Sequence, residues 1–187
     1  MREPTAIDLC CGSGGWTTGL MAAGLRVFGF DLVAHSQYPG ELVLQDVRTL
    51  DGRQFRGARV IVASPPCEEF TRHTLPWLKR HNPPPPDLSI VEACWRIRAE
   101  SGVPTIIENV RGSLRWLEPI LGTPHRCGSF WLFGDYPAIL PKMYRAAKGK
   151  HPPRPGEVAS KERMNHNRAL RAKVPPDLAY WIGQVYA

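Results

Sequence analysis

A cysteine follows two prolines at the end of an apolar run in this sequence. The run VIVA, residues 60–63, is typical of a buried strand, and Pro65 and Pro66 then stiffen the loop that holds Cys67. A thiol at a fixed position beside a strand end is a candidate nucleophile for covalent catalysis. The alternative is an inert buried cysteine, the commoner role of this residue, although the two glutamates that follow make burial less favourable.

A glycine-rich turn, DLCCGSGG at residues 8–15, joins a predicted strand to a predicted helix. Its glycines allow the backbone to approach a ligand at the exposed N-terminus of that helix. No lysine follows them as it does in a phosphate-binding GxxxxGKS loop, which disfavours hydrolysis of nucleoside triphosphates.

Carboxylates end the next two predicted strands. Asp31 is placed to accept hydrogen bonds from ribose hydroxyls, and Asp46 is placed to meet a purine edge. With the glycine turn, they suit a nucleoside cofactor such as S-adenosylmethionine, whose sulfonium is positively charged. The alternative is that these carboxylates are helix caps or surface charges.

The elements that position these residues alternate between strands and helices. Strands are predicted at 5–10, 26–30, 42–45, 58–63, 104–108 and 130–134, and helices after the glycine turn, at 87–102 and at the C-terminus. This alternation predicts an α/β fold with a doubly wound, mostly parallel, Rossmann-like sheet, whose ligands bind at the carboxyl ends of the strands. The polar residues at the strand ends therefore form one candidate site.

Composition indicates a soluble globular protein with a single domain over residues 1–187, with 43% apolar and 22% charged residues. No apolar run approaches the roughly 20 residues of a spanning helix, and no signal peptide is evident, so we expect a cytoplasmic protein without a membrane partner. The 5 cysteines and 6 histidines lack the spacing of metal ligands, which predicts reduced thiols and no metal site.

The net charge of +7 is concentrated in a basic segment, residues 142–173, which holds ten lysines and arginines against two glutamates. Clustered basic charge is typical of a protein that binds a polyanion, because lysine and arginine release the counterions condensed on phosphates. The alternative is a solvated basic tail.

Taken in order, the motifs resemble those of the cytosine carbon-5 DNA methyltransferases. DLCCGSGG resembles the family's cofactor loop, and SPPCEEFT at 64–71 resembles its nucleophile motif. IIENVRG at 106–112 is similar to its ENV motif, and VPPDLAYWIG at 174–183 is similar to its closing cofactor motif. The resemblance implies transfer of a methyl group from S-adenosylmethionine to carbon 5 of cytosine in DNA, with the base flipped out of the duplex or single-stranded.

The resemblance also implies the roles of individual residues. Cys67 would attack carbon 6 of the ring, Glu108 would hydrogen-bond or protonate N3, and Asn109 would hold the loop. The residues placed at the catalytic site are Cys67, Glu108, Asn109 and Pro66. Those placed at the cofactor are Asp8, Cys10, Gly12, Ser13, Gly14, Gly15, Asp31, Leu32, Asp46, Val47, Ser64, Pro65 and Val174. Those placed at the nucleic acid are Arg72, Arg111, Arg126, Lys148, Lys150, Arg163 and Arg168.

The sequence departs from the family pattern in three places, one of which is the closing motif, where Arg171, Ala172 and Lys173 replace the family's Gly-Asn before Val174. The family's QxRxR motif is replaced by His125, Cys127 and Ser129, so that Arg126 is one position away from an expected arginine. About forty residues separate Gly134 from the closing motif, too few for a target-recognition domain, and the basic segment occupies that place. Phosphate contacts carry little sequence information, so we expect relaxed sequence specificity or a specificity partner protein.

Three alternatives remain open at this point. The substrate could be RNA or a free deoxycytidine nucleotide instead of DNA, although the basic segment argues against the free nucleotide. The donor could be a modified cofactor, since Cys10 replaces the family's usual aromatic residue. The chain could also be a non-catalytic module that binds the cofactor and nucleic acid. The compact size suits a bacterial host, a phage or another mobile element.

Overall fold

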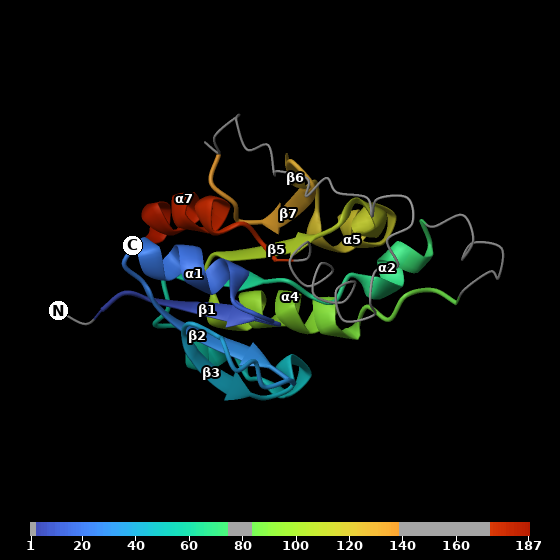
Figure 1. Cartoon of the computed structure of the whole chain (residues 1–187). Helices are drawn as coiled ribbons and strands as arrows, with labels where there is room; N and C mark the ends of the chain where they lie inside the picture. Colours follow the sequence, from blue (N-terminus) through green and yellow to red (C-terminus); the bar gives the residue numbers. More distant parts are fainter. Residues whose placement is uncertain (1–2, 75–83, 139–172) are drawn as a thin grey trace, which may run out of the picture.

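A seven-stranded sheet organises the residues described by the computed structural model, which are 3–74, 84–138 and 173–187 (Figure 1). The order is β3-β2-β1-β4-β5-β7-β6. β1 to β5 are mutually parallel, β7 is antiparallel to β5, and β6 is antiparallel to β7. The predicted α/β fold with a doubly wound, mostly parallel sheet is confirmed. The strands are β1 (Thr5–Leu9), β2 (Arg26–Asp31), β3 (Glu41–Leu44), β4 (Val60–Ala63), β5 (Thr105–Asn109), β6 (His125–Cys127) and β7 (Phe130–Gly134).

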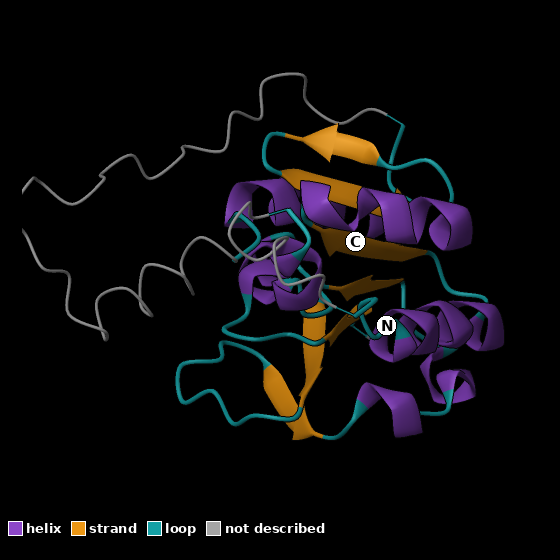
Figure 2. Ribbon diagram, turned by 90° about the vertical axis from the view of Figure 1, so that its right-hand side faces the viewer, coloured by secondary structure: helices purple, strands orange, loops and turns teal. Residues whose placement is uncertain are grey.

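Helices lie on both sides of this sheet (Figure 2). α1 and α7 cover one face through an apolar cluster that includes Trp16, Leu20 and Leu178, whereas α4 and α5 cover the other through Cys94, Ile97 and others. The helices are α1 (Gly15–Ala22), α2 (Glu68–Arg72), α4 (Ser89–Ser101), α5 (Leu114–Leu121) and α7 (Pro176–Tyr186), with 3₁₀ turns η1 (Val47–Thr49), η2 (Gly52–Phe55) and η3 (Arg111–Ser113).

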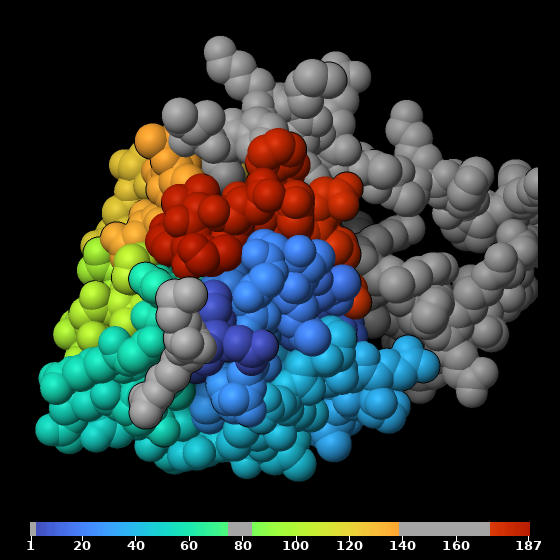
Figure 3. All heavy atoms as spheres, turned by 90° about the vertical axis from the view of Figure 1, so that its left-hand side faces the viewer, coloured from blue at the N-terminus to red at the C-terminus, as the bar shows by residue number. Residues whose placement is uncertain are grey.

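The C-terminal segment packs on the first helix, and Figure 3 shows α7 directly against α1. The backbones come close where α1 begins: a Cβ added to Gly15 would lie 2.8 Å from the backbone nitrogen of Val174. Val174 itself is buried. The closing motif predicted from the sequence therefore lies beside the glycine turn, although the two are far apart along the chain.

Several elements differ from the sequence predictions. β1 ends at Leu9 because Cys10 has a φ of +53°, which no strand residue adopts. α2, α5 and β6 were not predicted from the sequence, and α5 contains Pro119, which obscures a helical pattern. β6 and β7 form a hairpin around Gly128, whose φ is +63°.

Most of the basic segment lies outside the described residues, including the predicted nucleic-acid contacts Lys148, Lys150, Arg163 and Arg168. In the described part of the chain, no helix has the length and apolar character needed to cross a membrane. Nor do three or more histidine, cysteine or carboxylate side chains of those residues gather as metal ligands would.

Candidate active site

The glycine turn is fastened to the end of β2 by a carboxylate. The backbone N–H of Gly12 donates to Asp31 Oδ2 at 2.9 Å, and that of Val33 donates to Oδ1 at 3.0 Å. Gly12 has a φ of +50°, and a Cβ built on it would meet nothing within 4 Å, so the turn borders open space here. Ser13 and Leu32, both predicted cofactor contacts, are exposed beside this space, with Leu32 62% exposed.

Two predicted cofactor contacts point elsewhere. Cys10 packs against the cluster on the α4 face, where the neighbouring thiol of Cys94, followed by burial, raises the pKa of Cys10. Asp8 is fully buried beneath the turn, and its Oδ2 accepts a hydrogen bond from Thr17 Oγ1 at 2.6 Å. Burial raises the pKa of Asp8 to about 8. The structure therefore places Cys10 and Asp8 as supports under the turn, away from the open space.

Asp46 is engaged by its own neighbour. Its two carboxylate oxygens accept hydrogen bonds from the backbone N–H, Nε and Nη2 of Arg48, at 2.6 to 3.0 Å, and these bonds lower the pKa of Asp46. Val47, which follows Asp46, is buried, with 4% of its surface exposed. A purine amino group would have to share Asp46 with Arg48, which the sequence did not predict.

The ends of β4 and β5 bring the predicted catalytic residues together. The Asn109 side-chain N–H donates to the backbone oxygen of Pro65 at 3.1 Å, which ties the cysteine loop to β5. Glu108 is 6% exposed, and its Oε2 accepts a hydrogen bond from Ser64 Oγ at 3.0 Å. Burial raises the pKa of Glu108 to about 7, and the bond from Ser64 opposes this rise. Glu108 is thus a carboxyl that can hold or release a proton near neutrality.

Cys67 stands at the N-terminus of α2 and is half-buried, with Pro65 buried and Pro66 exposed before it. Burial, followed by the negative charge of Glu108, raises the pKa of the Cys67 thiol. The bonds from Asn109 to Pro65 and from Ser64 to Glu108 hold the loop that leads into Cys67 against the end of β5, where Glu108 lies. The expected nucleophile and the expected acid therefore share one site at the carboxyl ends of adjacent strands.

The predicted nucleic-acid contacts that lie in the described residues are divided between two regions. Arg72 and Arg111 are exposed on α2 and η3, which pack together, since a Cβ added to Gly112 would lie 3.0 Å from Phe70 O. Figure 1 shows α2 at the end of the sheet where the parallel strands finish. These two arginines therefore flank the cysteine loop.

Arg126 lies on the other face of the sheet. It pairs with Trp131 of β7, whereas the partner of Glu108 on β7 is Leu132. Since adjacent residues of a strand point to opposite faces, Arg126 and Glu108 lie on opposite sides. The Arg126 guanidinium stacks 5.8 Å from the centre of the Trp131 ring, and its Nε donates to Gly128 O. The register therefore does not bring Arg126 to the place of the missing family arginines.

Trp16 was not predicted as a site residue, but its indole N–H donates to Ser64 Oγ at 3.0 Å. The signal in the sequence is weak, because an aromatic residue in the first turn of a helix usually serves only the core. Trp16 is indeed 2% exposed and packs with Leu20.

A scan against protein-family models and a search of curated proteins found no match. Among solved structures, the Entamoeba histolytica methyltransferase EhMeth has a TM-score of 0.49 and 14% sequence identity, covering 72% of this chain and 53% of that chain. The Dnmt2 methyltransferase of S. pombe has a TM-score of 0.43 and 16% identity, covering 71% and 49%. The ribosomal protein L11 methylase of Lactobacillus delbrueckii subsp. bulgaricus has a TM-score of 0.45 and 15% identity, covering 72% and 70%. The chain spans about half the length of the first two proteins, and the likeness at these identities concerns the fold alone.

Proposed function

We propose that this protein transfers a methyl group from S-adenosylmethionine to carbon 5 of cytosine in DNA through a covalent adduct on Cys67. The observation that carries the proposal is that hydrogen bonds join the Cys67 loop after β4 to Glu108 and Asn109 at the end of β5, in motifs that resemble those of cytosine carbon-5 DNA methyltransferases. The cytosine ring is poorly reactive at carbon 5, so this chemistry needs both a nucleophile and an acid.

The residues around the glycine turn fit the cofactor. Gly12 borders open space, Asp31 has carboxylate oxygens at its edge, and Val174 brings the C-terminal segment alongside. Asp31 would hold the ribose, and the backbone near Val47 would contact the adenine. When bound there, S-adenosylmethionine supplies an electrophilic methyl group.

Cys67 and Glu108 would divide the remaining chemistry. The Cys67 thiolate attacks carbon 6 of cytosine, and Glu108 gives a proton to N3 as negative charge develops on the ring. This makes carbon 5 nucleophilic. Asn109 holds the Pro65 carbonyl and so fixes the cysteine loop against β5. A base then removes the carbon 5 proton, the Cys67 thiolate is eliminated from carbon 6, and N3 returns its proton to the Glu108 carboxylate.

A non-catalytic module that binds cofactor and nucleic acid is the second candidate. Two observations favour it: Arg126 faces away from Glu108, and the pKa of Cys67 is raised, so the thiolate is scarce in the resting protein. Intact Cys67 and Glu108 in one site favour the enzyme.

A mechanism-based trap distinguishes these candidates. An oligonucleotide that contains 5-fluorocytosine carries no removable proton at carbon 5, so an enzyme of this type stays attached to it after methyl transfer. We expect wild-type protein with S-adenosylmethionine to form a denaturant-resistant complex, which peptide mass spectrometry locates at Cys67. Cys67→Ser should abolish the complex, and Cys127→Ser, which alters a thiol buried in the core, should retain it.

DNA and RNA versions of the trap separate the two polymers, and mass spectrometry of the transferred group identifies the donor. Binding of the oligonucleotide without any covalent complex, on either polymer, would reject the enzyme in favour of the module.

A further inference from the structure

A chain of two hydrogen bonds reaches Glu108 from the first turn of α1. The Trp16 indole N–H donates to Ser64 Oγ at 3.0 Å, and Ser64 Oγ donates to Glu108 Oε2 at 3.0 Å. Trp16 is 2% exposed and Glu108 is 6% exposed, so water competes little for these bonds. These two hydrogen bonds therefore join α1, the loop after β4 and the end of β5.

The tryptophan fixes the direction of this chain. An indole nitrogen can only donate, so Trp16 occupies a lone pair of Ser64 Oγ and cannot accept the Ser64 proton. In the described residues that proton has one acceptor, Glu108 Oε2. Because Oε2 accepts, a neutral Glu108 carries its proton on Oε1.

Oε1 is the oxygen that the Ser64 bond leaves uncommitted. Within residues 3–74, 84–138 and 173–187, Oε1 has no hydrogen-bond partner. It is also not one of the fully buried polar atoms of these residues that lack a partner. The proton of Glu108 is thus held on the oxygen that the Ser64 bond leaves uncommitted, while the other oxygen is committed to Ser64.

We propose that Trp16 and Ser64 are positioning residues that keep the proton of Glu108 on Oε1, ready for transfer to the substrate. This inference rests on the proposed function. In that reaction, the Oε1–H bond breaks as N3 of cytosine takes the proton and the bond between Cys67 and carbon 6 forms. Ser64 then stabilises the resulting carboxylate through its bond to Oε2.

Other ionisable groups share this face of the sheet. Cys67 is close enough for the charge of Glu108 to raise its pKa. Asp8 on β1 and His125 on β6 lie on the same face, two strands away in either direction. The bond from Ser64 lowers the pKa of Glu108 against the rise caused by burial, so loss of that bond should raise the pKa further.

The test is a pH titration of the full chain without substrate, followed by carbon-13 NMR of the Glu108 side-chain carboxyl, assigned with Glu108→Gln. Ser64→Ala removes the bond, and we expect the titration midpoint to rise by about one pH unit. Trp16→Phe keeps an aromatic ring and removes the N–H, and a smaller rise is expected. Trp116→Phe is the matched control, because its buried indole N–H has no partner in the described residues, and its midpoint should equal that of wild type.

A second readout is the pH dependence of the 5-fluorocytosine trapping rate, whose alkaline limb should shift with the midpoint and be restored by Ser64→Thr. Circular dichroism checks that each variant is folded. Unchanged midpoints in folded Ser64→Ala and Trp16→Phe would overturn the inference. If wild-type protein forms no adduct while the midpoints move as expected, the hydrogen-bond chain stands and the proposed function fails. If the wild-type protein forms the adduct but the midpoints of the variants do not move, the proposed function stands and the inference about Trp16 and Ser64 fails.

Discussion

Cys67 and Glu108 influence each other through charge. An ionised Glu108 raises the pKa of Cys67, whereas a protonated Glu108 does not repel the developing thiolate. Since the pKa of Glu108 is about 7, protonation of the acid and ionisation of the nucleophile favour each other near neutral pH. The proposed chemistry requires this combination, because the acid must carry a proton when the thiolate attacks.

Glu108→Gln should separate thiol reactivity from catalysis. The substitution removes the negative charge near Cys67, so the pKa of Cys67 falls and the thiolate fraction at pH 8 rises. We expect alkylation of Cys67 by iodoacetamide to become about threefold faster, while trapping by 5-fluorocytosine DNA falls by about 100-fold because the acid is lost. Peptide mass spectrometry measures alkylation site by site, with buried Cys127 as an internal control. Slower alkylation of Cys67 in this variant would contradict the charge coupling.

The sequence predicted the main residues of this site but not their supports. Cys67, Glu108 and Asn109 were expected from short motifs, because motif and strand end coincide. The bond from Trp16 to Ser64 depends on the orientation of one side chain across 48 positions, which no local pattern reports. The pairing of Asp46 with Arg48 was not predicted, because side chains two positions apart in the sequence can adopt many relative orientations.

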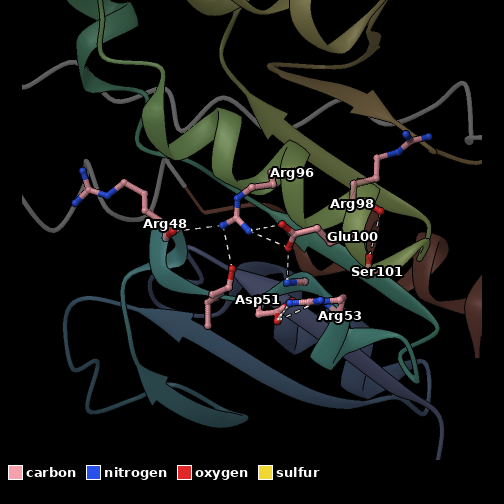
Figure 4. A network of polar contacts seen from close by, with 9 residues as sticks. Arg48, Asp51, Arg53, Arg96, Arg98, Glu100 and Ser101 are labelled. Atoms are coloured by element: carbon pink, nitrogen blue, oxygen red, sulfur yellow. Dashed lines mark hydrogen bonds and ion pairs between the residues drawn. The ribbon is translucent and has the colours of Figure 1, made fainter.

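At the scale of the elements, α4 holds the segment that follows β3. The Arg96 guanidinium donates to the backbone oxygens of Arg48 and Leu50, and Glu100 accepts from the backbone N–H of Gly52. Figure 4 shows Arg96 and Glu100 reaching this segment together, while Arg98 on the same helix points away from it. The contacts fix η1 and η2, and with them the turn at Val47 that is expected to contact the adenine.

Arg96→Ala and Arg98→Ala form a matched pair for this element. Arg98 pairs with Asp135 next to β7, far from the expected cofactor turn. We expect Arg96→Ala to weaken binding of S-adenosylmethionine about fivefold, because the turn loses two backbone anchors, and Arg98→Ala to leave it unchanged. Isothermal titration calorimetry measures the affinity, and thermal unfolding shows whether both variants lose similar stability. Equal affinities for the two variants would refute the positioning role of Arg96.

Strands were easier to predict than short helices in this chain. All four residues of β4 are buried and apolar, so the run itself identifies the strand. β6 has only three residues, two of them exposed, and becomes a strand through its pairing with β7. α2 has five residues and begins at the cysteine loop, so it offers no helical period. The missed elements are those that tertiary contacts define.

At the scale of the whole molecule, buried carboxyls make stability depend on pH. Asp8 and Glu108 have pKa values raised by burial to about 8 and about 7, well above the ordinary values of unfolded chains. Between pH 5 and these values, the folded protein keeps protons that the unfolded chain has released. The contribution of these two groups to the free energy of unfolding is therefore fully present below about pH 4, and it is lost as pH rises through each folded pKa.

Asp8→Asn should remove the larger part of this dependence. We expect the free energy of unfolding of wild-type protein to fall as pH rises from 5, with a slope of about 1.4 kcal/mol per pH unit for each buried carboxyl, up to about pH 7 for Glu108 and about pH 8 for Asp8. The variant should lose the slope due to Asp8, because an asparagine carries no proton to release. Asp51→Asn is the control, since the bonds from Arg53 lower the pKa of exposed Asp51 to about 2, outside this window. Urea unfolding at several pH values measures the slopes, and a stability that rises with pH in wild-type protein would show that Asp8 and Glu108 are ionised in the fold.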